Sequence, residues 1–265
     1  MSAEMPQEQA AKATPGGEAR PPFPSGLNPS GARRQAVVVL VLFYGIVFGS
    51  QLLPGGPSPR GIAPMLSALI VGMAMLVAVL CCMRRDASWR ASLALHPQSF
   101  GRTAGWSLLG LLGIYAANLA LTLTYVAIRG DVQAVASQRL GWLGMLADLP
   151  IEAILPLALF AGFWEEIVFR GFLLGRLRAA IPSALERGAR RRRDALAALL
   201  TAISFGLGHG YQGLLGILQT TLAGTVMGAL VLWRGSLWPA IGAHLAIDLF
   251  GLVALQLLKA FFKGL

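Results

Sequence analysis

Six ionisable side chains interrupt long apolar stretches of this sequence. They form three clusters: Glu165, Glu166 and Arg170; His209; and His244 with Asp248. A charged side chain at the middle of a bilayer costs at least about 2.5–3.5 kcal/mol, so such residues are rare and usually functional. Three clusters on separate apolar segments indicate one shared polar site rather than an isolated ion pair.

Helix geometry predicts which of these side chains face one another. Glu166 and Arg170 are four residues apart, so they share a helix face and can pair. Glu165 points about 100° away from Glu166, which leaves its carboxylate available for chemistry. His244 and Asp248 are also four residues apart, so Asp248 can orient the imidazole or hold its tautomer.

These residue types suit the activation of water. A buried glutamate can take a proton from water, a histidine can hold that water or share the proton, and the remaining His/Asp pair can stabilise an oxyanion. Two histidines and one glutamate also match a catalytic zinc set, here Glu165, His209 and His244, with water as fourth ligand. The sequence has no His-Glu-x-x-His segment, so such ligands would come from three helices. The residues demand no cofactor and leave zinc as an open alternative.

The composition indicates a membrane protein. Of the 265 residues 55% are hydrophobic and 13% are charged, about half the usual charged fraction of a soluble domain. Several apolar runs reach the length of about 18–20 residues that crosses a bilayer. An ordinary cytosolic globule, a secreted disulfide scaffold and a disordered tail protein are therefore excluded. The fold class predicted is all-α, a polytopic transmembrane helical bundle.

The apolar runs predict seven spanning helices, with an eighth as the upper limit. They cover residues 36–53, 62–83, 103–128, 151–177, 195–208, 214–233 and 237–258. Residues 1–34 are predicted to be a disordered cytoplasmic tail, since proline is frequent there and no apolar period is present. Residues 35–149 form the N-terminal transmembrane part and residues 150–258 the catalytic core. A short amphipathic surface helix is expected within 130–150.

The placement of positive charge predicts the orientation. With alternating spans, 16 of the 22 Lys and Arg lie on the side of the tail and 5 on the other. The tail and the basic loop at 187–193 are therefore expected in the cytoplasm, and the protein in the plasma (inner) membrane. The net charge of +10 reflects this pattern and contact with membrane lipids, not nucleic-acid binding. The run 190–193 is expected to anchor the topology against anionic lipid.

The depth of one histidine conflicts with a simple spanning helix. Counted from the nearest cytoplasmic arginine, Glu165 and His244 lie about 15–17 Å deep, near mid-membrane, at about 1.5 Å per residue. The same count places His209 at a depth of about 24 Å, which is deeper than the other site residues and too deep for a shared site. Either its helix starts above the membrane surface, or it tilts or breaks near Gly206, Gly208 and Gly210.

Three motifs in this order on successive apolar segments resemble the CPBP family of intramembrane proteases. They read Glu165-Glu-x-x-x-Arg170, Phe205-x-x-x-His209 and His244-x-x-x-Asp248. That family groups type II CAAX prenyl endopeptidases with bacteriocin-processing and immunity (Abi) proteins. The run Gly235-Ser-Leu-Trp-Pro-Ala-Ile-Gly-Ala-His244 also resembles the family, so the likeness covers roughly 150–255.

The resemblance implies an eight-helix-type fold with a cavity open to the cytoplasm. It implies that Glu165 and His209 activate water and that His244 and residue 248 support the oxyanion. CAAX enzymes characteristically have Asn where this chain has Asp248, and an ionised Asp cannot donate a hydrogen bond. Asp248 is therefore protonated, orients His244, or binds a metal.

Two classes of function follow from these residues. The first is an intramembrane endopeptidase that cleaves a peptide or protein substrate near the cytoplasmic membrane face, including CAAX-type processing of prenylated or membrane-associated peptides. The second is a non-catalytic membrane protein, such as an immunity factor or an ion or proton transporter, that uses the same carboxylates and histidines as a relay. A transporter usually has repeated halves, and the sequence has no internal repeat, which favours the endopeptidase.

Overall fold

The computed structural model describes residues 23, 27–52, 63–84, 86, 88–130, 132–133, 150–184 and 186–263, and within them every regular element is helical. The α-helices are α1 (Pro29–Leu52), α2 (Ala63–Met83), α3 (Trp89–Ser92), α4 (Phe100–Arg129), α6 (Ile151–Glu165), α7 (Leu174–Ala180), α8 (Arg187–Gly208), α9 (Gly213–Arg234) and α10 (Trp238–Lys263). A π-helix η1 (Glu166–Leu173) joins α6 to α7, and a 3-10 turn η2 (Gly210–Gln212) joins α8 to α9. The predicted all-α helical bundle is confirmed.

Five helices are long and apolar enough to cross a membrane by length and composition. They are Pro29–Gly49, Leu66–Met83, Phe100–Arg129, Gly210–Arg234 and Trp238–Leu257. The other two predicted spans are helical as well, but they lie on α6–η1–α7 and on α8, whose sequences carry the buried charges and the arginine run. The chain is an integral membrane protein.

The start of α1 differs from the prediction. Residues 29–34 were assigned to the disordered tail, whereas they form the first turns of α1. The Asn28 side chain accepts a hydrogen bond from the Ser30 backbone N–H at 3.1 Å, and Pro29 occupies the first helical position, where its missing N–H costs nothing. Residues 1–22 of the predicted tail and most of the predicted surface helix at 130–150 lie outside the described residues.

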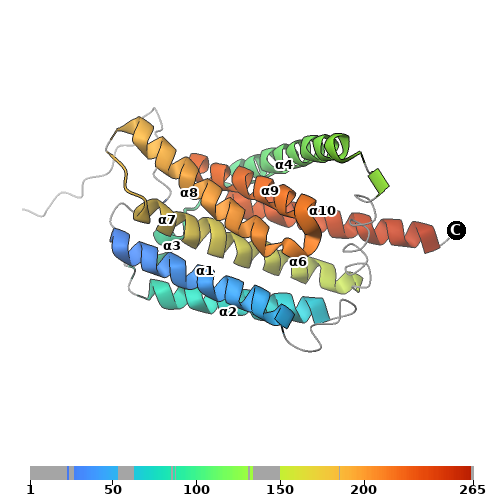
Figure 1. The fold of residues 1–265 in the computed structure, drawn as a ribbon, viewed down its shortest axis with the longest axis horizontal. Helices are drawn as coiled ribbons and strands as arrows, with labels where there is room; N and C mark the ends of the chain where they lie inside the picture. The colour runs from blue at the N-terminus through green and yellow to red at the C-terminus, as the bar shows by residue number, and fades with distance from the viewer. Residues whose placement is uncertain are drawn as a thin grey trace, which may run out of the picture.

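The helix that carries the glutamates runs through the middle of the bundle. In Figure 1 the continuous rod α6–η1–α7 lies between the pair α1 and α2 on one side and α8, α9 and α10 on the other. α8 packs along α9, and α10 contacts α4, α6 and α9. Side chains on η1, on the end of α8 and on α10 can therefore meet inside the protein.

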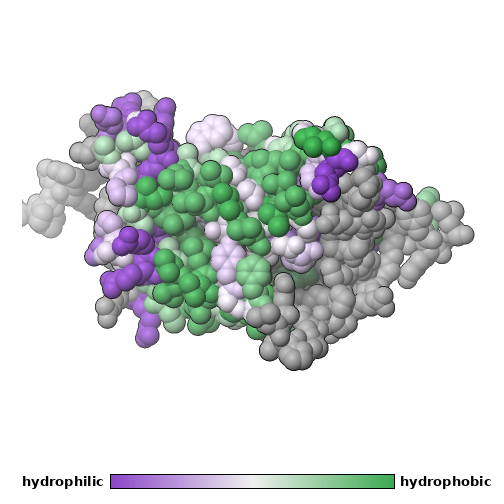
Figure 2. All heavy atoms as spheres, viewed as in Figure 1, coloured by the Kyte–Doolittle hydropathy of each residue, from purple (hydrophilic) through white to green (hydrophobic). Residues whose placement is uncertain are grey.

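Polar and apolar surfaces separate along the bundle. Figure 2 shows hydrophilic residues gathered at the end that carries the N-termini of α1 and α8, and a hydrophobic middle beside it. We call this middle the hydrophobic belt. Large apolar side chains of the long helices α1, α2 and α4, such as Val41, Ile70 and Leu119, are more than half exposed. A soluble monomer rarely exposes such a continuous apolar surface, so the belt is the lipid-facing surface. We call the hydrophilic end, with the arginines of 187–193, the basic end.

The contact between α8 and α9 is close because both helices present small residues. A Cβ atom at Gly206 would lie 2.7 Å from the Ile217 carbonyl oxygen and closer still to the Thr221 hydroxyl. A Cβ at Gly224 would lie 3.2 Å from Cα of Ala202. The backbones of the two helices can approach this closely only while residue 206 is glycine.

We therefore expect Gly206→Ala to destabilise the protein by about 1–3 kcal/mol, as overpacking of a close contact does. Because His209 lies one turn further along, the same variant should also lower any activity of the site. Thermal unfolding in detergent measures the first effect. Gly210→Ala is the matched control, since a Cβ at Gly210 meets nothing within 4 Å. Equal melting temperatures of the two variants would contradict the prediction.

Candidate active site

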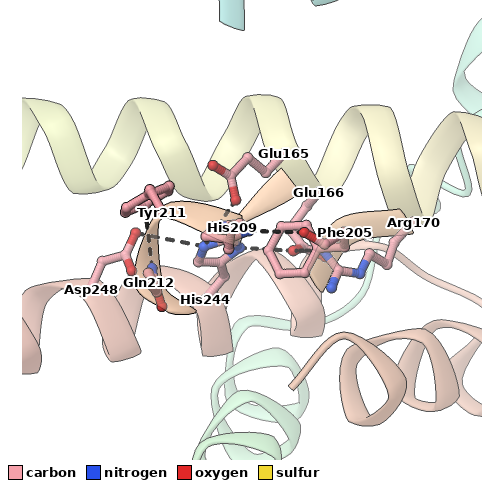
Figure 3. Close-up of polar contacts among 9 residues, drawn as sticks. All are labelled: Glu165, Glu166, Arg170, Phe205, His209, Tyr211, Gln212, His244 and Asp248. Atoms are coloured by element: carbon pink, nitrogen blue, oxygen red, sulfur yellow. Dashed lines mark hydrogen bonds and ion pairs between the residues drawn. The ribbon is translucent and has the colours of Figure 1, made fainter. Parts of the chain in front are cut away.

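The six ionisable residues that the sequence singles out come from three helical segments. Glu165 ends α6, Glu166 and Arg170 lie on η1, His209 follows α8, and His244 and Asp248 lie on α10. Figure 3 shows their side chains directed toward one another between α6 and α10. The predicted shared polar site is therefore present as one cluster.

Glu166 is the acceptor at the centre of this cluster. It is 0% exposed, and its Oε1 accepts hydrogen bonds from Arg170 Nη1 at 2.8 Å and from His244 Nδ1 at 2.8 Å. The predicted pairing of Glu166 with Arg170 is confirmed. The bond to His244 was not predicted, because no local spacing reveals a contact between residues 78 positions apart. The two donors compensate the buried negative charge, and Glu166 in turn positions both of them.

The segment that carries Glu166 and Arg170 is wound as a π-helix over Glu166–Leu173. Such i→i+5 segments are rare and frequently occur at functional sites, because the extra residue in the turn redirects side chains. All residues of η1 except Ile167 are buried. The wider turn thus faces the centre of the bundle, where an ordinary α-helix would be expected from the apolar pattern alone.

His244 uses its two ring nitrogens for different partners. Because Nδ1 bonds to a carboxylate, it carries a proton and donates it to Glu166. Nε2 faces two further carboxylates, with Glu165 Oε2 at 3.7 Å and Asp248 Oδ2 at 3.6 Å. These distances are ion-pair distances that exceed a direct hydrogen bond. The expectation that Asp248 shares the face of His244 is confirmed.

Glu165 differs from its neighbour in both exposure and partners. Its side chain is 14% exposed, and the contact that it makes with the site is the long one to His244 Nε2. The carboxylate of Glu165 is thus accessible, whereas that of Glu166 is enclosed. This matches the prediction that the 100° step along the helix separates the two side chains.

His209 occupies the point where α8 ends. α8 begins at Arg187, well before the apolar part, and stops at Gly208; η2 then turns the chain, and Gly213 adopts a φ of 73°. The helix thus breaks near Gly208 and Gly210, which is one of the two explanations that the sequence offered for the depth of His209. His209 Nδ1 bonds to the carbonyl oxygen of Phe205 at 2.9 Å, so this nitrogen donates and Nε2 is the nitrogen that can accept a proton.

Two aromatic residues complete the surroundings of the histidines. The Phe205 ring centroid lies 4.1 Å from Cζ of Arg170, 4.6 Å from the His209 ring and 6.1 Å from the His244 ring. The Tyr211 ring lies 5.9 Å from His209, and its hydroxyl accepts a hydrogen bond from Gln212 Nε2 at 3.1 Å. Phe205 thus separates the guanidinium from the imidazoles. Its position four residues before His209, on the same helix face, was the sequence signal for this contact.

The zinc alternative requires three donor side chains that converge on one point. No group of three or more His, Cys, Asp or Glu side chains within the described ranges is arranged to hold a metal ion. Zinc binding by Glu165, His209 and His244 stays a prediction.

The fold and the site together define a class: an integral membrane protein whose acidic and histidine side chains meet inside a helical bundle. Residues 147–250, which contain all six site residues, match the family model described as type II CAAX prenyl endopeptidase Rce1-like. The match is consistent with the CPBP family, so the predicted resemblance is confirmed over these residues. No curated protein and no solved structure was found to match the chain. The matched family is one of proteases, which implies a peptide or protein substrate.

Proposed function

We propose that this protein is an intramembrane endopeptidase in which Glu165 activates the attacking water with the help of His209. The observation that carries the proposal is the difference between the two adjacent glutamates. Glu166 is enclosed and bonded to Arg170 and His244, whereas Glu165 is accessible and stands 3.7 Å from His244 Nε2. A general base must be within reach of the water, and an enclosed carboxylate with two strong donors is a poor one.

The reaction proceeds in two proton transfers. Glu165 accepts a proton from water while Nε2 of His209 orients that water, and the water oxygen bonds to the carbonyl carbon of the substrate. The C–N bond then breaks as Glu165 returns the proton to the leaving nitrogen. One water is consumed, and the Glu165 carboxylate ends in its starting state.

The developing oxyanion is stabilised by His244. Glu166 holds the Nδ1 proton, and the carboxylate of Asp248, 3.6 Å from Nε2, favours the protonated ring. A protonated Nε2 can donate to the oxyanion, which an ionised Asp248 cannot do itself. Of the three roles open to Asp248, we therefore propose that it orients and charges His244.

Cleavage takes place near the cytoplasmic face, with the basic end of the bundle in the cytoplasm of a plasma (inner) membrane protein. The gathering of hydrophilic residues at this end supports the orientation, because positive loops stay on the cytoplasmic side. The match to the family model supports CAAX-type C-terminal processing, with prenylated or other membrane-associated peptides as substrates.

The first experiment is cleavage of a panel of prenylated and unprenylated peptides by the purified protein in detergent. Wild type and His209→Ala are compared, each with and without a zinc chelator. Since general acid–base catalysis contributes about 100-fold to 10,000-fold, we expect the wild type to be insensitive to chelator and the variant to lose at least about 100-fold in kcat/KM. Loss of wild-type cleavage in the presence of the chelator would contradict water activation by Glu165 alone and indicate catalysis by a metal. A folded wild type that cleaves no peptide would favour the non-catalytic immunity or transport function.

A further inference from the structure

A groove outside the active site lies at the basic end, between the chain that follows α7 and the first turns of α8. Its volume is about 260 Å³. The apolar wall includes Ile181, Pro182 and Leu196, and the polar wall includes Ser183, Arg192 and Arg193. The lining thus has an apolar part and a cationic part.

The charges beside the groove leave one of its arginines without an acidic partner. Asp194 accepts hydrogen bonds from Arg178 at 2.8 and 3.0 Å and from Arg193 at 2.8 Å, so its carboxylate is fully engaged. Arg192 forms no ion pair with any described residue, and Arg190 and Arg191 precede it directly. Arg192 therefore presents an uncompensated guanidinium at the groove, in a region where neighbouring arginines raise the positive potential.

The groove lies where the polar surface meets the apolar one. α8 carries arginines up to Arg193 and is apolar from Ala195 onward, and Leu196, on the apolar side of this boundary, is exposed. In Figure 2 the hydrophilic surface at this end of the bundle borders directly on the hydrophobic belt. A boundary of this kind in a membrane protein sits at the level of the lipid headgroups.

We propose that this groove binds the headgroup of an anionic phospholipid. The Arg192 guanidinium pairs with the phosphate, and the apolar wall contacts the glycerol and the first part of the acyl chains. A soluble anion gains nothing from Ile181, Pro182 and Leu196, whereas an amphiphile uses both walls. The bound lipid would hold the start of α8, the helix that His209 follows. This inference is independent of the proposed peptidase activity.

The test measures lipid binding to the full-length protein in detergent by native mass spectrometry, with phosphatidylglycerol and phosphatidylcholine as probes. We expect phosphatidylglycerol to bind preferentially, and Arg192→Gln to weaken its binding about tenfold. Arg190→Gln is the matched control: it removes the same charge from the same helix, and its side chain does not line the groove. We expect this control to weaken binding by no more than about twofold.

A second variant separates the groove from the charge. Ala189 lines the groove, so Ala189→Phe should fill it and lower phosphatidylglycerol binding while all arginines remain. Equal effects of Arg192→Gln and Arg190→Gln, or full binding by Ala189→Phe, would overturn the proposal in favour of general surface attraction. Competition by millimolar inorganic phosphate as strong as that by phosphatidylglycerol would overturn it in favour of a soluble anion.

Discussion

Replacing Glu165 by glutamine should reduce peptide-bond cleavage by at least about a thousandfold, because an amide cannot accept the proton of the attacking water. The substitution keeps the size of the side chain, and among the described residues the one polar contact that it alters is the 3.7 Å approach to His244 Nε2. Since the side chain makes no shorter polar contact among the described residues, membrane insertion and thermal stability should stay within about 1 kcal/mol of wild type.

Single-turnover cleavage of the best peptide from the panel measures this effect, and thermal unfolding in the same detergent checks the fold. Glu152→Gln is the matched control, because Glu152 is an exposed glutamate in the first turn of the same helix, α6. It should cleave at the wild-type rate. Undiminished cleavage by Glu165→Gln would remove Glu165 from the role of general base.

Replacing the neighbouring Glu166 by alanine should have the opposite profile, with the main loss in stability. Glu166 Oε1 accepts hydrogen bonds from Arg170 and His244, and Arg170 is only 1% exposed. The variant leaves a buried guanidinium without its counter-charge, a change that costs about 3–5 kcal/mol. Because Nε and Nη2 of Arg170 already lack a hydrogen-bond partner, the remaining environment has little capacity to compensate. His244 would also lose its orientation, so activity should fall too.

Thermal or denaturant-induced unfolding of Glu166→Ala, compared with Glu165→Ala, measures this difference. The double variant Glu166→Gln/Arg170→Met removes both charges and should recover part of the lost stability, since the penalty arises from the charge left alone. A Glu166→Ala protein as stable as Glu165→Ala would contradict the structural role of Glu166. The structural role of Glu166 would also be contradicted if the double variant lost more free energy of unfolding than its two single substitutions lose together.

The two adjacent glutamates therefore have different roles in the proposed site. Glu166 bonds to Arg170 and His244 inside the bundle, and Glu165 is accessible, so in the proposed mechanism Glu165 is the residue that meets the reacting water. Consecutive side chains of a helical segment point in different directions, so two adjacent glutamates cannot both face the same partners. Exchanging the two roles would require a rotation of the whole segment.

Much of the fold was readable from the sequence because it depends on local pattern. Each predicted span coincides with a helix, since a long apolar run can satisfy its backbone groups in lipid only as a helix. The pairs Glu166–Arg170 and His244–Asp248 followed from spacing alone, because residues four apart meet on any helix. The start of α1 was missed, although Asn28-Pro29 is a local capping signal.

What the tertiary structure decided is how the helices face one another. The bond from His244 Nδ1 to Glu166 joins two helices, and the groove at Arg192 lies between α8 and the chain that follows α7. The spacing of residues along the sequence does not give the relative rotation of such segments. The π winding of Glu166–Leu173 likewise depends on what packs around it. A sequence determines which side chains share a helix face. Only the packing between helices determines which faces meet, and the site lies where the faces of three helical segments meet.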